Sequence, residues 1–148
     1  MEFSQLIDDF AKRHNVENLV AVDGAAALDI DGIIVIIVNK GELLNLSAEI
    51  GEPPVEGAAV FANLLLEANM QSGAFFAKAP GPGQYIIVQR LNLALVDDDS
   101  FDSTLEAFVN QAELWRRLLS DFRPAAKAAS ERAAEGKPSF GSTGFMQV

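Results

Sequence analysis

The chain has 148 residues and a formal net charge of −10, from 21 acidic and 11 basic side chains, so we expect one domain that binds neither nucleic acid nor an anionic membrane surface. It has no cysteine and one histidine, His14, which excludes thiolate nucleophiles, iron–sulfur clusters and sites built from two imidazoles. No signal sequence is recognisable and no apolar stretch reaches the ~18 residues of a membrane span, so we expect a cytoplasmic protein without membrane insertion.

The first predicted element is a helix over about Glu2–His14. Its apolar residues recur at spacings of three and four and therefore lie on one face. The basic residues that end the segment suit the negative end of a helix dipole, and Asn15 readily takes the left-handed conformation that follows a helix. His14 is then a cation at a helix end. The alternative, a lone general base, has no visible nucleophile beside it.

Strand-like patterns begin at Leu19. Asp31-Gly32 lies between strand-forming segments and predicts a hairpin, because both central residues of a type I′ turn need positive φ. The segment 33–38 has no polar alternation, so we expect a central strand that is covered on both faces. The next strand, Leu44–Ile50, alternates apolar and polar residues and should have one face in water.

A second helix is predicted over about Glu56–Gln71, with apolar residues nearly all round it. A helix of that kind is buried on more than one side. In a chain this short a second subunit is the simplest cover, so we predict a homodimer with this helix near the interface. A deeply central helix in a monomer is the alternative.

Two further strands, Ala74–Ala77 and Tyr85–Leu95, come before a third predicted helix. Ser103 and Glu106 fit a capping box at the start of that helix. Its apolar residues then recur at helical spacing and form a seam that should pack against the sheet.

Pro124 lacks an N–H and is expected to stop or kink the third helix. We therefore place an α+β domain at residues 1–123 and an Ala-rich helical extension at residues 124–135. Residues 136–148 are rich in Gly, Ser, Thr and Pro, and we expect them to form a disordered tail.

The sequence predicts no catalytic site, no metal and no cofactor. Asp97–Asp99 and Asp102 form an acidic cluster, but a calcium loop needs ligands at fixed spacing around a glycine. Acidic residues at a helix N-terminus are explained by the helix dipole alone. Gly81-Pro82-Gly83 lacks the spacing of a phosphate-binding loop and is expected to be a turn. An acidic, dimer-prone domain of this kind is expected to work by binding protein.

Three stretches carry a resemblance to a known family. They are 44–54, with alternating leucines and closing prolines, Leu64–Met70, with a Leu-Glu-Ala-Asn sequence, and Phe108–Leu119. In this order they resemble the class I type III secretion chaperones, the Tir chaperone (CesT) family, over about residues 1–123. The resemblance agrees with an α+β fold: an antiparallel sheet of about five strands and three helices, in the order α-β-β-β-α-β-β-α, in a homodimer.

The resemblance implies a non-enzymatic, cytosolic homodimer without a cofactor. Such a protein binds the N-terminal segment of a secreted effector or translocator in extended form, and keeps it soluble until handover to the secretion ATPase. Carried over to this sequence, the dimer interface comprises Phe61, Leu65, Ala68, Asn69, Phe75 and Phe76. The cargo groove comprises Phe3, Leu6, Ile7, Phe10, Leu28, Ile30, Ile34 and Ile36, of which some must instead belong to the core.

Two alternatives stay open. A small hotdog-like enzyme also sets a buried helix against an antiparallel sheet, but it needs a catalytic carboxylate in a pocket and a coenzyme groove, and the sequence signals neither. A regulatory dimer of the same fold would bind protein but no secreted cargo. The long helix that follows all the strands favours the chaperone.

Overall fold

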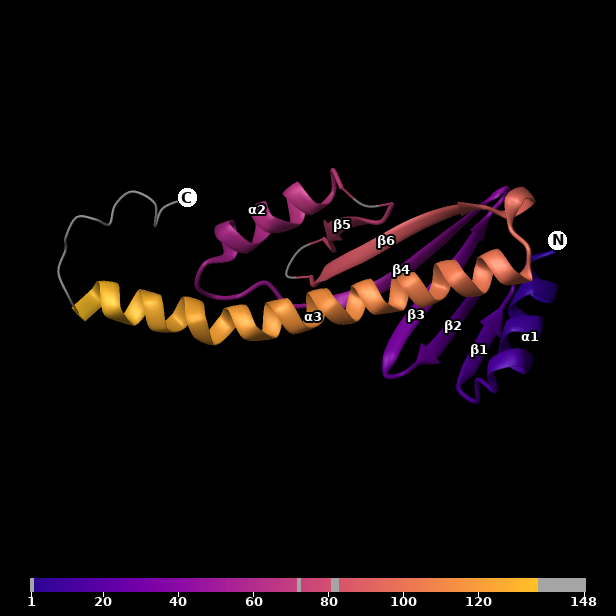
Figure 1. The fold of residues 1–148 in the computed structure, drawn as a ribbon, viewed down its shortest axis with the longest axis horizontal. Helices are drawn as coiled ribbons and strands as arrows, with labels where there is room; N and C mark the ends of the chain where they lie inside the picture. Colours follow the sequence, from indigo (N-terminus) through magenta and orange to yellow (C-terminus); the bar gives the residue numbers. More distant parts are fainter. Residues whose placement is uncertain (1, 72, 81–82, 136–148) are drawn as a thin grey trace.

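The computed structural model describes residues 2–71, 73–80 and 83–135 (Figure 1). The tail predicted at 136–148 lies outside the described residues. In chain order the elements are α1 (Phe3–His14), β1 (Leu19–Val22), β2 (Ala25–Ile30), β3 (Ile33–Lys40), β4 (Leu43–Gly51), α2 (Ala58–Ala68), β5 (Phe75–Lys78), β6 (Tyr85–Asn92), the 3-10 turn η1 (Leu93–Leu95) and α3 (Asp98–Glu135).

The strands form one antiparallel sheet in the order β1-β2-β3-β4-β6-β5. The predicted α+β class is confirmed. The sheet has six strands where about five were predicted, because the segment from Leu19 to Ile30 folds back at Gly24, where φ is 78°, and forms two strands. α3 packs on β3 and β4, α1 lies beside α3 at the β1 end, and α2 packs on β5 at the other end (Figure 1). The buried side chains of all three helices meet on one face of the sheet.

The hairpin between β2 and β3 forms where the sequence predicted it. Asp31 has φ 53° and Gly32 has φ 86°, as a type I′ turn requires. The N–H of Gly32 donates to Oδ1 of Asp29 at 3.1 Å, which closes the turn. At the end of α1, Asn15 takes the predicted left-handed conformation with φ 50°.

The core lies between α3 and the helix-covered face of the sheet. The predicted seam of α3 is confirmed, because Leu105, Phe108 and Leu119 are fully buried. Further along α3, Phe122 contacts the ring of Phe61 on α2, with ring centroids 5.2 Å apart. One helix thus joins the sheet to α2, and aromatic packing of this kind buries a large apolar area.

α3 begins earlier than predicted and is continuous through Pro124 with the predicted helical extension. Ser103 lies inside the helix, because Asp97 and Ser100 form the cap: the N–H of Ser100 donates to Oδ1 of Asp97 at 2.8 Å, and the N–H of Asp97 donates to Oγ of Ser100 at 3.0 Å. Pro124 does not stop the helix, which runs on to Glu135. Pro124 and Ser120 are both exposed, so water can solvate the carbonyl that lacks a donor.

Within the protomer β3 is covered on one face only, and the cover predicted for its second face is not part of the described chain. Ile33, Val35 and Ile37 are buried, but the alternate residues Ile34 and Ile36 are 57% and 45% exposed. A run of β-branched residues does not indicate whether the second face of the strand packs against the same chain or against another one. The predicted strand from Tyr85 to Leu95 also ends early, at Asn92, whose side-chain oxygen accepts from the N–H of Ala94 at 3.0 Å and starts the 3-10 turn.

Candidate functional site: an open sheet face

The face of the sheet that turns away from the helices carries a continuous row of mostly apolar residues. Paired residues of an antiparallel sheet point to the same face, so the register defines this row. It runs across all six strands as Val20, Ala27, Ile36, Ser47, Val88 and Phe75. Val22, Ala25 and Val38 form a second apolar row beside it, next to Asn45. We call this surface, together with Ile34 on the same face of β3 as Ile36, the open sheet face.

Charged residues flank these rows. Asp29 pairs with Ile34 on β2 and β3, and Glu49 pairs with Ile86 on β4 and β6, so an acidic and an apolar side chain stand opposite each other in both pairs. On β6 the guanidinium of Arg90 lies 5.3 Å from the ring centroid of Phe75, in cation–π range. An apolar centre with a polar rim is the anatomy of a protein-binding surface.

Both edge strands of the sheet are short. β1 and β5 have four residues each, and they end the sheet on its two sides. Val20 and Val22 of β1 are each 66% exposed on the open sheet face. An edge strand presents unpaired main-chain donors and acceptors on its outer side, which is a template for an added strand. The apolar rows therefore reach a sheet edge.

The structure divides the predicted cargo residues into two groups. Leu6, Ile7 and Phe10 of α1 and Leu28 of β2 are buried in the core, whereas Phe3 and Ile30 are partly buried beside it. Ile34 and Ile36 alone in this set belong to the open sheet face. Sequence reasoning missed its other members on β1, β2 and β6. The alternation of Val20, Val22, Ala25 and Ala27 about the turn at Gly24 was the available signal.

Half of the predicted dimer residues are also internal to the protomer. Phe61, Leu65 and Phe76 are buried. Asn69 satisfies its amide within the chain: its Oδ1 accepts from the N–H of Phe76 at 2.6 Å, and its Nδ2 donates to the carbonyl of Phe76 at 3.4 Å, which fixes the end of α2 to β5. Ala68 is partly buried in the core, and Phe75 lies on the open sheet face.

α2 and the turn that follows it nevertheless leave an apolar surface in solvent. Leu64, Leu66 and Met70 are exposed, the last two by 62% and 88%. The helix is apolar nearly all round, and the protomer covers only the side that carries Phe61 and Leu65. The exposed side therefore has no cover within the described part of the chain.

The single histidine lies in an ion-pair cluster that joins α1 to α3. Arg13 donates to both carboxylate oxygens of Asp102, at 2.5 and 3.1 Å, and contacts Asp98 at 3.3 Å. Nε2 of His14 lies 2.9 Å from Oδ2 of Asp102. Hydrogen bonding to Arg13, with a contribution from His14, lowers the pKa of Asp102. This geometry places His14 at the end of α1, beside the carboxylate of Asp102.

Within the described residues, no three His, Cys, Asp or Glu side chains are grouped so that they could hold a metal ion. In the same part of the chain, no helix is both long enough and apolar enough to cross a membrane.

Solved structures with a similar fold include several complexes. The structure of the ExsC–ExsE complex matches with a TM-score of 0.67 and 24% identity, over 78% of this chain and 91% of that one. The HopA1–SchA chaperone–effector complex matches with a TM-score of 0.64 and 17% identity, over 78% and 93% of the two chains. The Yersinia pestis type III secretion chaperone SycH, in complex with a stable fragment of YscM2, matches with a TM-score of 0.61 and 19% identity, over 77% and 99%.

At these identities the likeness shows a shared fold. No curated protein matches the chain in sequence. A family model does match: that of the Tir chaperone protein (CesT) family, over residues 5–116, which is most of the chain. This match confirms the resemblance carried by the stretches at 44–54, 64–70 and 108–119. The chain therefore belongs to the Tir chaperone protein (CesT) family.

Proposed function

We propose that the protein is a cytoplasmic type III secretion chaperone that binds the N-terminal segment of a secreted effector or translocator in extended form. The observation that carries this proposal is the open sheet face, an apolar surface that spans the sheet and reaches the edge strand β1. Membership of the family and the chaperone–effector complexes among its structural neighbours support it. The protein has no chemical step to perform in this role.

The physics of the surface favours an extended partner. A segment that adds to β1 makes main-chain hydrogen bonds independent of its sequence, and its apolar side chains reach the rows beside Val20 and Val22. An effector segment that is unfolded before binding loses conformational entropy when it binds. A large contact area is therefore needed for useful affinity, and a face that spans all the strands supplies it.

The working form is proposed to be a homodimer. The exposed apolar side of α2, with Leu66 and Met70, is the surface that a second subunit would cover, and the neighbouring strand β5 would extend it. The predicted interface residues Phe61, Leu65 and Phe76 would then support this surface from inside the protomer, and Ala68 and Asn69 would lie at its margin, whereas Phe75 is on the open sheet face. Light scattering should give about twice 15.9 kDa.

Co-purification from the native host tests the proposed function. A tagged full-length chain should retain a protein whose N-terminal region becomes resistant to protease only in the complex. The matched control is the same chain with Ile34→Thr and Ile36→Thr, which should retain much less of that protein. Recovery of a partner that binds by a folded domain would contradict the proposal. Equal recovery of the partner with the unchanged protein and with the double variant would contradict it as well.

A further inference from the structure

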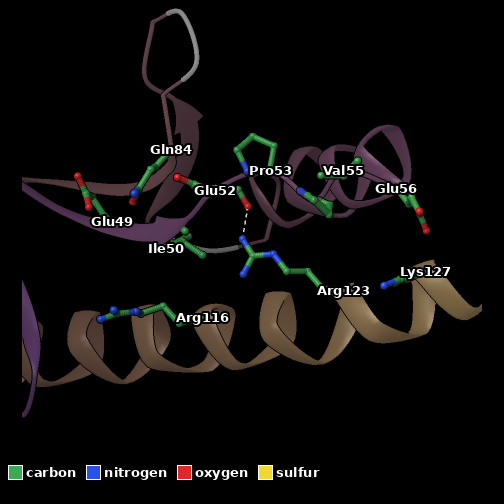
Figure 2. A pocket seen from close by; sticks show the side chains of 12 residues that line it. Glu49, Ile50, Glu52, Pro53, Val55, Glu56, Gln84, Arg116, Arg123 and Lys127 are labelled. Carbon is green, nitrogen blue, oxygen red and sulfur yellow. Dashed lines mark hydrogen bonds between the residues drawn. The ribbon is translucent and has the colours of Figure 1, made fainter.

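A charged groove runs between the C-terminal half of α3 and the segment that joins β4 to α2 (Figure 2). Its volume is about 690 Å³. The α3 wall carries the basic residues Arg116, Arg123 and Lys127, and the opposite wall carries the acidic residues Glu49, Glu52 and Glu56. Ile50 and Pro54, which are buried, also line the groove. We call this site the two-signed groove.

The opposite charges of its walls do not pair with each other. Within the described residues, the ion pairs involve other side chains: Arg13, His14 and Arg117 with their partners. Arg123 donates instead to the main-chain oxygen of Glu52, as the dashed line in Figure 2 marks. Oε2 of Glu56 is shielded from solvent and has no hydrogen-bond partner. A shielded carboxylate oxygen without a donor is unfavourable, so Glu56 has an unmet hydrogen-bond acceptor at this wall.

The groove continues toward the open sheet face. Arg116 and Glu49 also line an adjoining cleft of about 330 Å³, whose other walls include Ile34, Ile36 and Ile86. A chain that lies over Ile34 and Ile36 can therefore pass between Arg116 and Glu49 into the groove. The occupants of the two surfaces are thus expected to be parts of one segment.

Spacing and polarity define that segment. Arg116 and Lys127 are separated by ~16 Å along the helix axis, at 1.5 Å per residue, which an extended chain spans with about five residues. Successive side chains of an extended chain point to opposite sides. One side then faces Arg116 and Lys127 and the other faces the three glutamates, and the peptide passes over Arg123, which is hydrogen-bonded across the groove to the main-chain oxygen of Glu52. A uniformly acidic or uniformly basic segment would be repelled by one of the walls.

We propose that the two-signed groove binds an extended peptide in which acidic and basic residues alternate, and that this peptide continues the effector segment on the open sheet face. The chain's own residues 136–148 contain no acidic residue and do not fit. The chemistry of the groove stands by itself, whereas the source of the peptide rests on the proposed function.

Two peptides of equal composition test the chemistry. One is an eight-residue peptide that alternates Glu and Lys, and the other repeats Glu-Glu-Lys-Lys, which in extended form puts both charges on each side. Titration of the full-length protein at low salt, followed by fluorescence anisotropy, should show about tenfold tighter binding of the alternating peptide. Added salt should weaken that binding. Equal affinities, or binding of neither peptide because a second copy fills the groove, would overturn the proposal.

Variants locate the binding. Arg116→Glu with Lys127→Glu should weaken the alternating peptide about tenfold, because two charge pairs become repulsions. The control variant, Arg117→Glu with Arg132→Glu, changes the net charge of the same helix by the same amount. Neither residue lines the groove, so the affinity for the alternating peptide should be unchanged. Arg123 is kept because it holds the main chain of Glu52. Thermal melting should be similar for both variants, and equal affinities in the two would refute the site.

The failure of this inference can be told apart from the failure of the proposed function. Ile34→Thr with Ile36→Thr should leave the alternating peptide bound as before, since neither side chain lines the groove. If the alternating peptide binds but no effector does, the groove binds peptides of this charge pattern, and the proposal that an effector supplies the peptide is wrong. If an effector binds but the alternating peptide does not, the proposed role of the groove is wrong and the proposed chaperone function is unaffected.

Discussion

Replacing Ile34 and Ile36 by threonine tests the open sheet face without disturbing the core. Threonine keeps the β-branched shape that suits a strand and removes apolar area. The two isoleucines are 57% and 45% exposed, so together they offer about the area of one whole side chain. Covering such a side chain is worth about 1.5–3 kcal/mol. The double variant keeps part of that area, so we expect an effector Kd about tenfold higher.

The assay is isothermal titration of the co-purified effector segment into each variant. Stability should change by no more than about 1 kcal/mol, because substitutions at exposed positions usually cost little. Val35→Thr is the control: this neighbour is fully buried on the opposite side of the same strand, so its substitution should lower stability and leave the open face intact. An unchanged Kd in the double variant would refute the assignment of the site.

Three further predictions concern the protomer and the dimer. Asp102 has its pKa lowered by Arg13, so it stabilises the fold above the unfolded-state pKa and that stability is lost as pH falls through the folded-state pKa. Asp102→Asn should therefore lower the melting temperature at pH 7, and the loss should shrink steadily as the pH is lowered below the ordinary carboxyl pKa of 3.8; a loss that does not change with pH would contradict this. Leu66→Asp, at an exposed position of α2, should halve the mass seen by light scattering while the protomer stays folded, and an unchanged mass would remove α2 from the interface. Gly51→Ala should lower the free energy of unfolding, measured by chemical denaturation, by about 1–3 kcal/mol. Gly51 has φ 148°, and an added Cβ would lie 2.9 Å from Cδ2 of Leu119. An unchanged free energy of unfolding would show that Leu119 moves aside.

Local signals predicted the elements that local physics controls. α1 and the β2–β3 hairpin form as expected because Asn15, Asp31 and Gly32 determine backbone conformation by themselves. The start of α3 was not predictable in the same way. Both Asp97 and Ser103 are good caps, and Phe101, which lies between them and is fully buried in the core, favours the longer helix.

The candidate site could be predicted only in part, because the sequence does not say what covers an apolar side chain. Ile34 and Ile37 belong to one β-branched run, yet one is exposed and the other is fully buried. On α2, the neighbouring residues Leu65 and Leu66 differ in the same way, since Leu65 is buried and Leu66 is exposed. The sheet register and the position of α3 decide each case, and both depend on contacts between residues far apart in the chain.

Hydrogen exchange of the chaperone with and without its co-purified effector segment tests the central claim most directly. If an extended effector segment adds to the sheet, the outward amides of β1, within Leu19–Val22, should exchange much more slowly in the complex. The effector segment should itself be protected in an alternating pattern, as in a strand. Unchanged exchange in β1, with protection confined to α2 or to a folded domain of the partner, would contradict the account.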